Sequence, residues 1–96
     1  MSPVNRRRAL VIGTHNTSVP DLDRLIDRHS LEVVFTVFGP SAPKLATLVT
    51  IQHILEYDAD VVIVPHLTTA EIQGDGHWQA VAGLADILTA DGAWLR

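Results

Sequence analysis

Runs of apolar residues mark the strands expected in this chain. Val61-Val62-Ile63-Val64 shows no alternation of apolar and polar positions, so both faces of that strand are expected to be buried. Such continuous runs are typical of a parallel sheet that helices cover on each side. Three runs rich in β-branched residues and a weaker fourth are expected to form the sheet: residues 9–12, 31–38, 61–64 and 93–95.

The segments between these runs carry the signals of helices. Ser18-Val19-Pro20-Asp21 has a capping-box pattern, with a proline that the first turn tolerates and an aspartate that the helix dipole favours. An apolar stripe formed by Leu22, Leu25 and Ile26 follows it. A last helix is expected after the Gly74-Asp75-Gly76 turn and is expected to stop at Asp91-Gly92. Its apolar positions are Trp78, Val81, Ala82, Ala85 and Leu88.

The middle helix is expected to begin near Ser41-Ala42-Pro43 and to end near Tyr57. Its buried stripe is predicted from apolar residues that recur three and four positions apart. These residues are Leu45, Leu48, Ile51 (or Gln52) and Leu55, with Val49 and Ile54 broadening the stripe. The leucines of this helix are therefore expected to face the sheet.

Strands and helices that alternate along the chain predict an α/β domain in three layers. Right-handed crossovers of this length give an open, mostly parallel, four-stranded sheet with helices on both faces. We expect the strand order 2-1-3-4, with the first and third strands in the centre. The 96 residues suffice for one domain, and residues 1–5, which are polar and contain a proline, are expected to be loose.

Composition and charge exclude several classes of function. Seven basic and eleven acidic residues give a net charge of −4, so we expect no broad DNA-binding surface, although Arg6-Arg7-Arg8 forms one local basic spot. The absence of cysteine excludes disulfides, thiol catalysis and cysteine-ligated metal centres. No apolar stretch approaches the roughly 20 residues of a membrane span. We therefore expect a cytoplasmic protein that makes no membrane contact.

Ligands of open α/β sheets bind beyond the carboxyl ends of the strands, where the strand order reverses. At this edge the sequence places the candidate ligand-binding residues Thr14, His15, Asn16, His66 and Thr68. A helix follows the first loop, so the loop could hold an anion, but it has neither G-x-G-x-x-G nor a Walker motif. The simpler interpretation is that Thr17 and Ser18 cap the helix and that Asn16 makes a turn.

The histidines at the same edge could in principle hold a metal ion. His15 and His66 would be neighbours if the first and third strands pair, and His77, which follows Asp75, could approach them. None of the local spacings matches a known ligand motif, so no metal and no cofactor is expected. A G-x-S-x-G nucleophile motif is also absent, and paired carboxylates are missing from this edge.

The chain resembles the N-terminal catalytic domain of the serine recombinases, the resolvases and invertases, over nearly its whole length. Residues 8–17 (RALVIGTHNT) are similar to that family's opening strand, R-A-x-x-Y-A-R-V-S-T. Residues 43–45 (PKL) are similar to its P-G-L helix start, residues 60–67 (DVVIVPHL) to its D-V-V-V-V-x-x-L strand, and residues 91–95 (DGAWL) to its closing x-G-V-x-L strand. The resemblance implies a resolvase-like fold.

The same comparison implies that the catalytic chemistry is missing. Asn16 stands where the family has its nucleophilic serine, Thr14 where it has an arginine, and Ile12 where it has a tyrosine. Residues 67–72 (LTTAEI) replace the family's L-D-R-L-x-R, and phosphoryl transfer relies on such cationic groups. The chain also ends at Arg96, before that family's dimerisation helix and DNA-binding helix-turn-helix, so neither is expected. No catalytic residue is carried over.

Three hypotheses for the function follow. The first is a catalytically inactive interaction domain that self-associates or binds another protein, with Trp78 and Trp94 as candidate interface anchors because tryptophan is enriched at interface hot spots. The alternative for these residues is that Trp78 packs in the core and Trp94 covers a sheet edge. The second hypothesis is an enzyme that binds a small ligand, an anion or a metal at the edge around His15, Asn16, His66 and Thr68. The third is a DNA-associated role through the basic spot.

Overall fold

The computed structural model describes residues 7–13, 19–38 and 43–95, and the segment expected to be loose, 1–5, lies outside them. Within this part of the chain, five strands form one sheet in the order β2-β1-β3-β4-β5. The strands are β1 (Arg7–Gly13), β2 (Leu31–Phe38), β3 (Val61–Val64), β4 (Asp86–Thr89) and β5 (Trp94–Leu95). The helices are α1 (Val19–Arg28), α2 (Pro43–Tyr57), α3 (Thr69–Gln73) and α4 (Gly76–Ala82).

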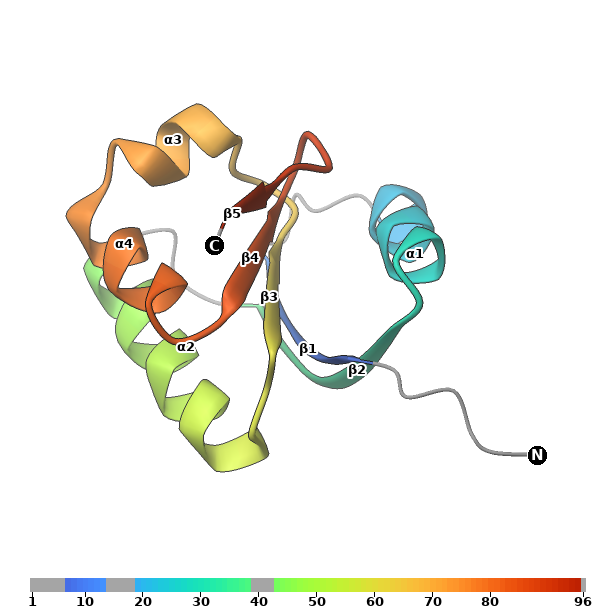
Figure 1. Cartoon of the computed structure of the whole chain (residues 1–96), viewed down its shortest axis with the longest axis horizontal. Coiled ribbons are helices and arrows are strands. Elements are labelled where there is room, and N and C mark those ends of the chain that lie inside the picture. Colours follow the sequence, from blue (N-terminus) through green and yellow to red (C-terminus); the bar gives the residue numbers. More distant parts are fainter. Residues whose placement is uncertain (1–6, 14–18, 39–42, 96) are drawn as a thin grey trace.

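The expected α/β architecture is confirmed, with helices on both faces of a mostly parallel sheet (Figure 1). β1 pairs in parallel with β2 and with β3, so the predicted central position of the first and third strands is confirmed as well. Helix α1 lies on one face, and α2 and α4 lie on the other (Figure 1). Side chains of the central strands alternate between these two layers, because successive residues of a strand point to opposite faces.

The predicted fourth strand is wrong in place and direction. Asp86–Thr89, expected to belong to the last helix, is the fourth strand and pairs in parallel with β3, with Val62 opposite Ile87. Residues 93–95 were expected as strand four, but Trp94–Leu95 is a fifth strand, antiparallel to β4. Helix α4 stops at Ala82, and Ile87 and Leu88, both 0% exposed, fill opposite faces of the sheet.

Two apolar clusters hold the layers together. The cluster beneath α2 and α4 contains alternate strand residues together with Trp78 and Val81 of α4: Leu10, Ile12, Val62, Val64 and Ile87 are the strand members. The cluster beneath α1 contains the residues between them, including Val11, Val61 and Ile63. All of these strand residues are at most 4% exposed, which explains why β3 shows no alternation in its sequence.

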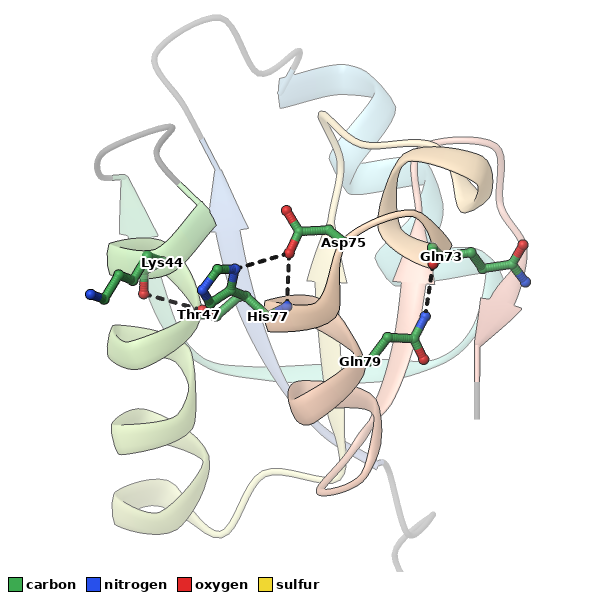
Figure 2. A network of polar contacts seen from close by, with 6 residues as sticks. All are labelled: Lys44, Thr47, Gln73, Asp75, His77 and Gln79. Atoms are coloured by element: carbon green, nitrogen blue, oxygen red, sulfur yellow. Dashed lines mark hydrogen bonds and ion pairs between the residues drawn. The ribbon is translucent and has the colours of Figure 1, made fainter.

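Helix α2 is found where it was expected, but the predicted stripe faces the wrong way. Leu45, Leu48 and Leu55 are 54%, 55% and 71% exposed. The side facing the sheet consists of Ala46, Thr47, Thr50 and Ile54, all at most 8% exposed. The threonine hydroxyls donate back to helix carbonyls: Thr50 to Ala46 at 2.7 Å, and Thr47 to Lys44 at 3.2 Å (Figure 2). Small side chains with satisfied hydroxyls let the helix approach the sheet closely, which turns the leucines outward.

Ser30 and Gly92, two residues outside the helices, both have positive φ angles. Ser30, between α1 and β2, has a φ of 52°, in the left-handed region where a Cβ is unfavourable, whereas Gly92 adopts a φ of 74° without that cost. Ser30→Gly is therefore expected to raise the free energy of unfolding by about 0.5–1 kcal/mol. Gly92→Ala, the matched control, is expected to lower it by a similar amount. Urea denaturation measures both, and equal signs for the two variants would contradict the assignment.

Candidate functional site

Two of the five residues predicted at the strand ends can be placed. Thr14, His15 and Asn16 lie outside the described residues, so the predicted meeting of His15 with His66 stays a prediction. His66 lies two residues after the end of β3, and Thr68 immediately precedes α3. Both therefore lie at the carboxyl end of a central strand, the edge where open α/β sheets bind ligands.

His66 is half-buried against the end of β1. Burial lowers the pKa of its imidazole below the ordinary value, and a nearby Glu71 carboxylate and a backbone hydrogen bond with Ile12 oppose that shift. Because desolvation penalises the charged form, the neutral imidazole is favoured in the folded state. A neutral histidine at a sheet edge can accept or donate a proton, but no hydrogen bond joins the side chain of His66 to that of Thr68.

This lowered pKa gives a testable dependence of stability on pH. The unfolded chain binds more protons than the folded one at pH values below the ordinary histidine pKa of 6.5. The free energy of unfolding is therefore expected to fall as the pH drops through 6.5 toward the lower folded pKa of His66. Denaturant titrations at pH 7.5 and 5.5 measure the change, and His66→Gln is expected to reduce it. A change of the same size in that variant would assign the effect to other groups.

Thr68 has a local structural role. Its hydroxyl accepts a hydrogen bond from the backbone N–H of Glu71 at 3.3 Å, and its own backbone N–H donates to the Glu71 carboxylate at 3.1 Å. The two residues form the capping box that starts α3. The sequence contains the signal of this capping box, Thr68-x-x-Glu71, but α3 was not among the predicted helices. Thr68 is therefore engaged as a helix cap.

A cluster of Thr69, Thr89 and Asp91 lies beside this cap. Thr69 Oγ1 donates to the Asp91 carboxylate at 3.1 Å and lies 3.2 Å from Thr89 Oγ1, while Thr89 also donates to Asp91. The hydrogen bond from Thr89 is the main reason that the pKa of Asp91 is lowered, with that from Thr69 adding to it. These polar groups satisfy one another and tie the start of α3 to the turn between β4 and β5.

A shallow pocket of about 470 Å³ adjoins this turn. Arg24 and Arg28 of α1 line one side, and Pro65 and Asp91 line the other. Arg24 is exposed and pairs with Asp21 at 3.6 Å, so its charge is already partly compensated. The pocket is thus lined by two arginines and by two carboxylates, Asp21 and Asp91, and neither His66 nor Thr68 is part of its lining.

The third histidine predicted at this edge, His77, contacts the N-cap residue of its own helix. Asp75 caps α4 by accepting from the His77 backbone N–H at 2.8 Å, and the same carboxylate oxygen lies 3.2 Å from His77 Nδ1 (Figure 2). In the part of the chain that the structure describes, no group of three or more histidine and acidic side chains is placed to hold a metal ion.

Arg7 and Arg8 of the basic spot make contacts within the domain at the amino end of β1. Arg7 pairs with Asp86 at 2.6 Å and lies 5.4 Å from the ring of Trp94. Arg8 donates twice to the carbonyl of Tyr57, the last residue of α2, at 3.0 and 2.8 Å. Both guanidinium groups therefore join elements of the fold, and Arg6 lies outside the described residues.

The two tryptophans have different environments. Trp78 is 2% exposed and belongs to the core beneath α2 and α4, so the prediction that it anchors an interface is wrong for the folded domain. Its apolar neighbours on α4 and the sheet enclose the indole. Trp94 is half-buried on the edge strand β5, where its ring meets His29 edge-on at 5.1 Å. It covers the sheet edge, and its role as an anchor stays a prediction.

The outer face of α2 is the most distinctive surface of the described residues. We use this name for the exposed side chains of that helix: Lys44, Leu45, Leu48, Gln52, Leu55 and Glu56. At 3.6 residues per turn they fall within an arc of about 120°. The apolar spacing predicted that these leucines were buried, so it did not reveal this surface.

Comparisons with protein-family models, with curated proteins and with solved structures give no match to this chain. The resemblance to resolvases therefore rests on the sequence motifs alone. No helix in the described ranges has both the length and the apolar character that a membrane crossing requires.

Proposed function

We propose that this domain is a catalytically inactive, resolvase-like module that self-associates through the outer face of α2. The observation that carries the proposal is the exposure of three leucines on one face of a 15-residue helix, at 54%, 55% and 71%. Single exposed apolar residues are normal on protein surfaces. A row of them along one helix is typical of a contact surface.

The inward side of α2 supports this interpretation. The helix already contacts the sheet through Ala46, Thr50 and Ile54, which are buried. The leucines are therefore not needed for the monomer's core, and only a contact with another molecule removes them from water. Full burial of a leucine contributes about 1.5–3 kcal/mol, so covering even part of three such side chains is a substantial driving force.

The charges of the outer face of α2 favour a second copy of the domain as its binding partner. Lys44 and Glu56 flank the leucines at opposite ends of the helix, so the face carries one charge of each sign. A face with this charge pattern is complementary to the same face of a second copy that is rotated by about 180°. A closed two-fold pair of this kind is the commonest symmetry of soluble oligomers.

The absence of recombinase chemistry is proposed from the sequence. An asparagine amide at position 16 cannot take the place of a serine that attacks phosphorus, and the arginines expected at residues 67–72 are missing. The proposal also assigns the Thr69, Thr89 and Asp91 cluster to holding the turn after β4, since its members bond to one another.

Sedimentation of purified protein at micromolar to millimolar concentrations tests the proposal. The wild-type chain is expected to gain mass with concentration, and a variant with Leu45, Leu48 and Leu55 all replaced by Gln is expected to stay monomeric and folded. Leu84→Gln is the matched control, because Leu84 is 49% exposed but lies after α4 and is not part of α2. A wild-type chain that is monomeric throughout, or association unchanged in the triple variant, would contradict the proposal.

A further inference from the structure

The two charged residues of α2 lie at the ends of the helix that its own dipole disfavours. Lys44 is in the first turn, which carries partial positive charge, and Glu56 is in the last turn, which carries partial negative charge. Lys44 has no acidic partner among the described residues, and the Glu56 carboxylate lies 3.5 Å from the ring of His53. Within one molecule this placement is unfavourable.

We infer that two copies of the domain pair through α2 with their helices antiparallel, so that Lys44 of each copy lies level with Glu56 of the other. The inference rests on the proposed function and adds the arrangement and the residues that set it. In this pairing each charge meets both an opposite charge and the end of the second helix that favours it. A parallel pairing would instead bring like charges to the same level.

The positions on the outer face fit this arrangement along its whole length. Lys44 and Glu56 are equally distant from the middle of the helix, as are Leu45 and Leu55, and Leu48 and Gln52. An antiparallel pair therefore sets each leucine against a leucine or against the aliphatic part of a glutamine. The spacing of 45, 48, 52 and 55 is three, four and three residues, the repeat by which paired helices interlock.

Gln52 gives the face a single polar position among its leucines. A lone polar residue in such a row costs stability but fixes the register of the paired helices. The helix is about 22 Å long at 1.5 Å per residue, which is short for an interface. We therefore expect reversible association with a dissociation constant in the micromolar to millimolar range rather than a permanent dimer.

Cysteine cross-linking reports the direction of the pairing, because the natural chain contains no cysteine. Leu45→Cys and Leu55→Cys are prepared separately, one of them with an affinity tag, and each is oxidised alone and in a mixture. Positions 45 and 55 are about 15 Å apart along a helix, whereas a disulfide requires Cα atoms within about 7 Å. The antiparallel pair predicts a mixed disulfide in the mixture and little product from either variant alone.

The possible outcomes distinguish the antiparallel pairing from self-association through the outer face of α2. Disulfide-linked dimers from each single variant alone would indicate parallel helices and overturn this inference, while self-association through the face would stand. A wild-type chain that stays monomeric in sedimentation would reject the proposed function, and the inference with it. Association without any cross-link at 45 or 55 would place the contact elsewhere and reject both.

Charge reversal gives a second, independent readout. Lys44→Glu and Glu56→Lys are each expected to weaken association about fivefold, because each brings like charges together twice in the symmetric pair. The double variant is expected to restore it. Each single change also suits the dipole of its own helix, so the melting temperature of the dilute monomer is expected to rise slightly. Weaker association together with a lower monomer melting temperature would indicate a folding defect instead and would count against the pairing.

Discussion

Replacing Trp78 by alanine is expected to lower the free energy of unfolding by about 3–5 kcal/mol. The indole is 2% exposed and is the largest of the fully buried side chains, in the cluster where α4 meets α2 and the sheet. Its removal leaves a cavity that the rigid strands beneath it cannot fill. A domain of this size has a total stability of about 5–15 kcal/mol, so much of the margin would be lost.

Trp94→Ala is the control for that variant. Trp94 is half-buried on β5 and contacts His29 and Arg7 at the sheet edge, so its loss is expected to cost about 1–2 kcal/mol. Urea denaturation followed by circular dichroism compares the two variants. Equal losses, or a larger loss for Trp94, would contradict the placement of Trp78 in the core.

Two adjacent residues of α2 are expected to differ strongly in how much stability the domain loses when each is replaced by alanine. Ile54 is 5% exposed and packs beneath the helix, so Ile54→Ala is expected to cost the dilute monomer about 2–4 kcal/mol. Leu55 is 71% exposed, so Leu55→Ala is expected to change monomer stability by less than about 0.5 kcal/mol.

Thermal or urea unfolding of both variants, at concentrations where the protein is monomeric, measures this difference. The comparison holds the helix and the type of substitution nearly constant and varies only the direction in which the side chain points. A large loss in Leu55→Ala with a small loss in Ile54→Ala would mean that the helix is turned as the sequence pattern predicted, with its leucines toward the sheet.

The sequence predicts most of the sheet because the signal of a buried strand is strong. Val61 to Val64 have apolar side chains on both faces, which a parallel sheet between two helical layers requires. The last part of the chain was mispredicted because Ala85 and Leu88 continue the spacing of Trp78 and Val81, as in one longer helix. The turn after α4 breaks that helix, and the β-branched Ile87 fits a strand between β3 and β5.

The rotation of α2 could not be predicted from its apolar pattern. Its sequence has apolar residues on almost every side, so the leucine row and the small residues compete for the buried side. The sheet packs against Ala46, Thr47 and Thr50, because small side chains allow close approach and the threonine hydroxyls are satisfied within the helix. The hydrogen bonds of those hydroxyls depend on the three-dimensional structure, so the spacing of apolar residues does not predict them.

The strand-end residues were predicted from topology alone, which explains their mixed outcome. The position of His66 next to the end of β1 follows from strand order, and the structure has it there. The roles of the neighbouring side chains depend on local partners instead. Thr68 caps a helix that was not predicted, and Asp91 bonds to Thr69, 22 positions away in sequence.

The most direct test of self-association through α2 is a dilution series followed by ¹⁵N–¹H NMR spectra of the wild-type domain. If the domain self-associates through α2, the amide signals of Leu45, Leu48, Gln52 and Leu55 are expected to shift with concentration, while those of the buried strand β3 stay in place. Shifts confined to the edge strands β2 and β5, or spectra that do not change between micromolar and millimolar protein, would contradict it.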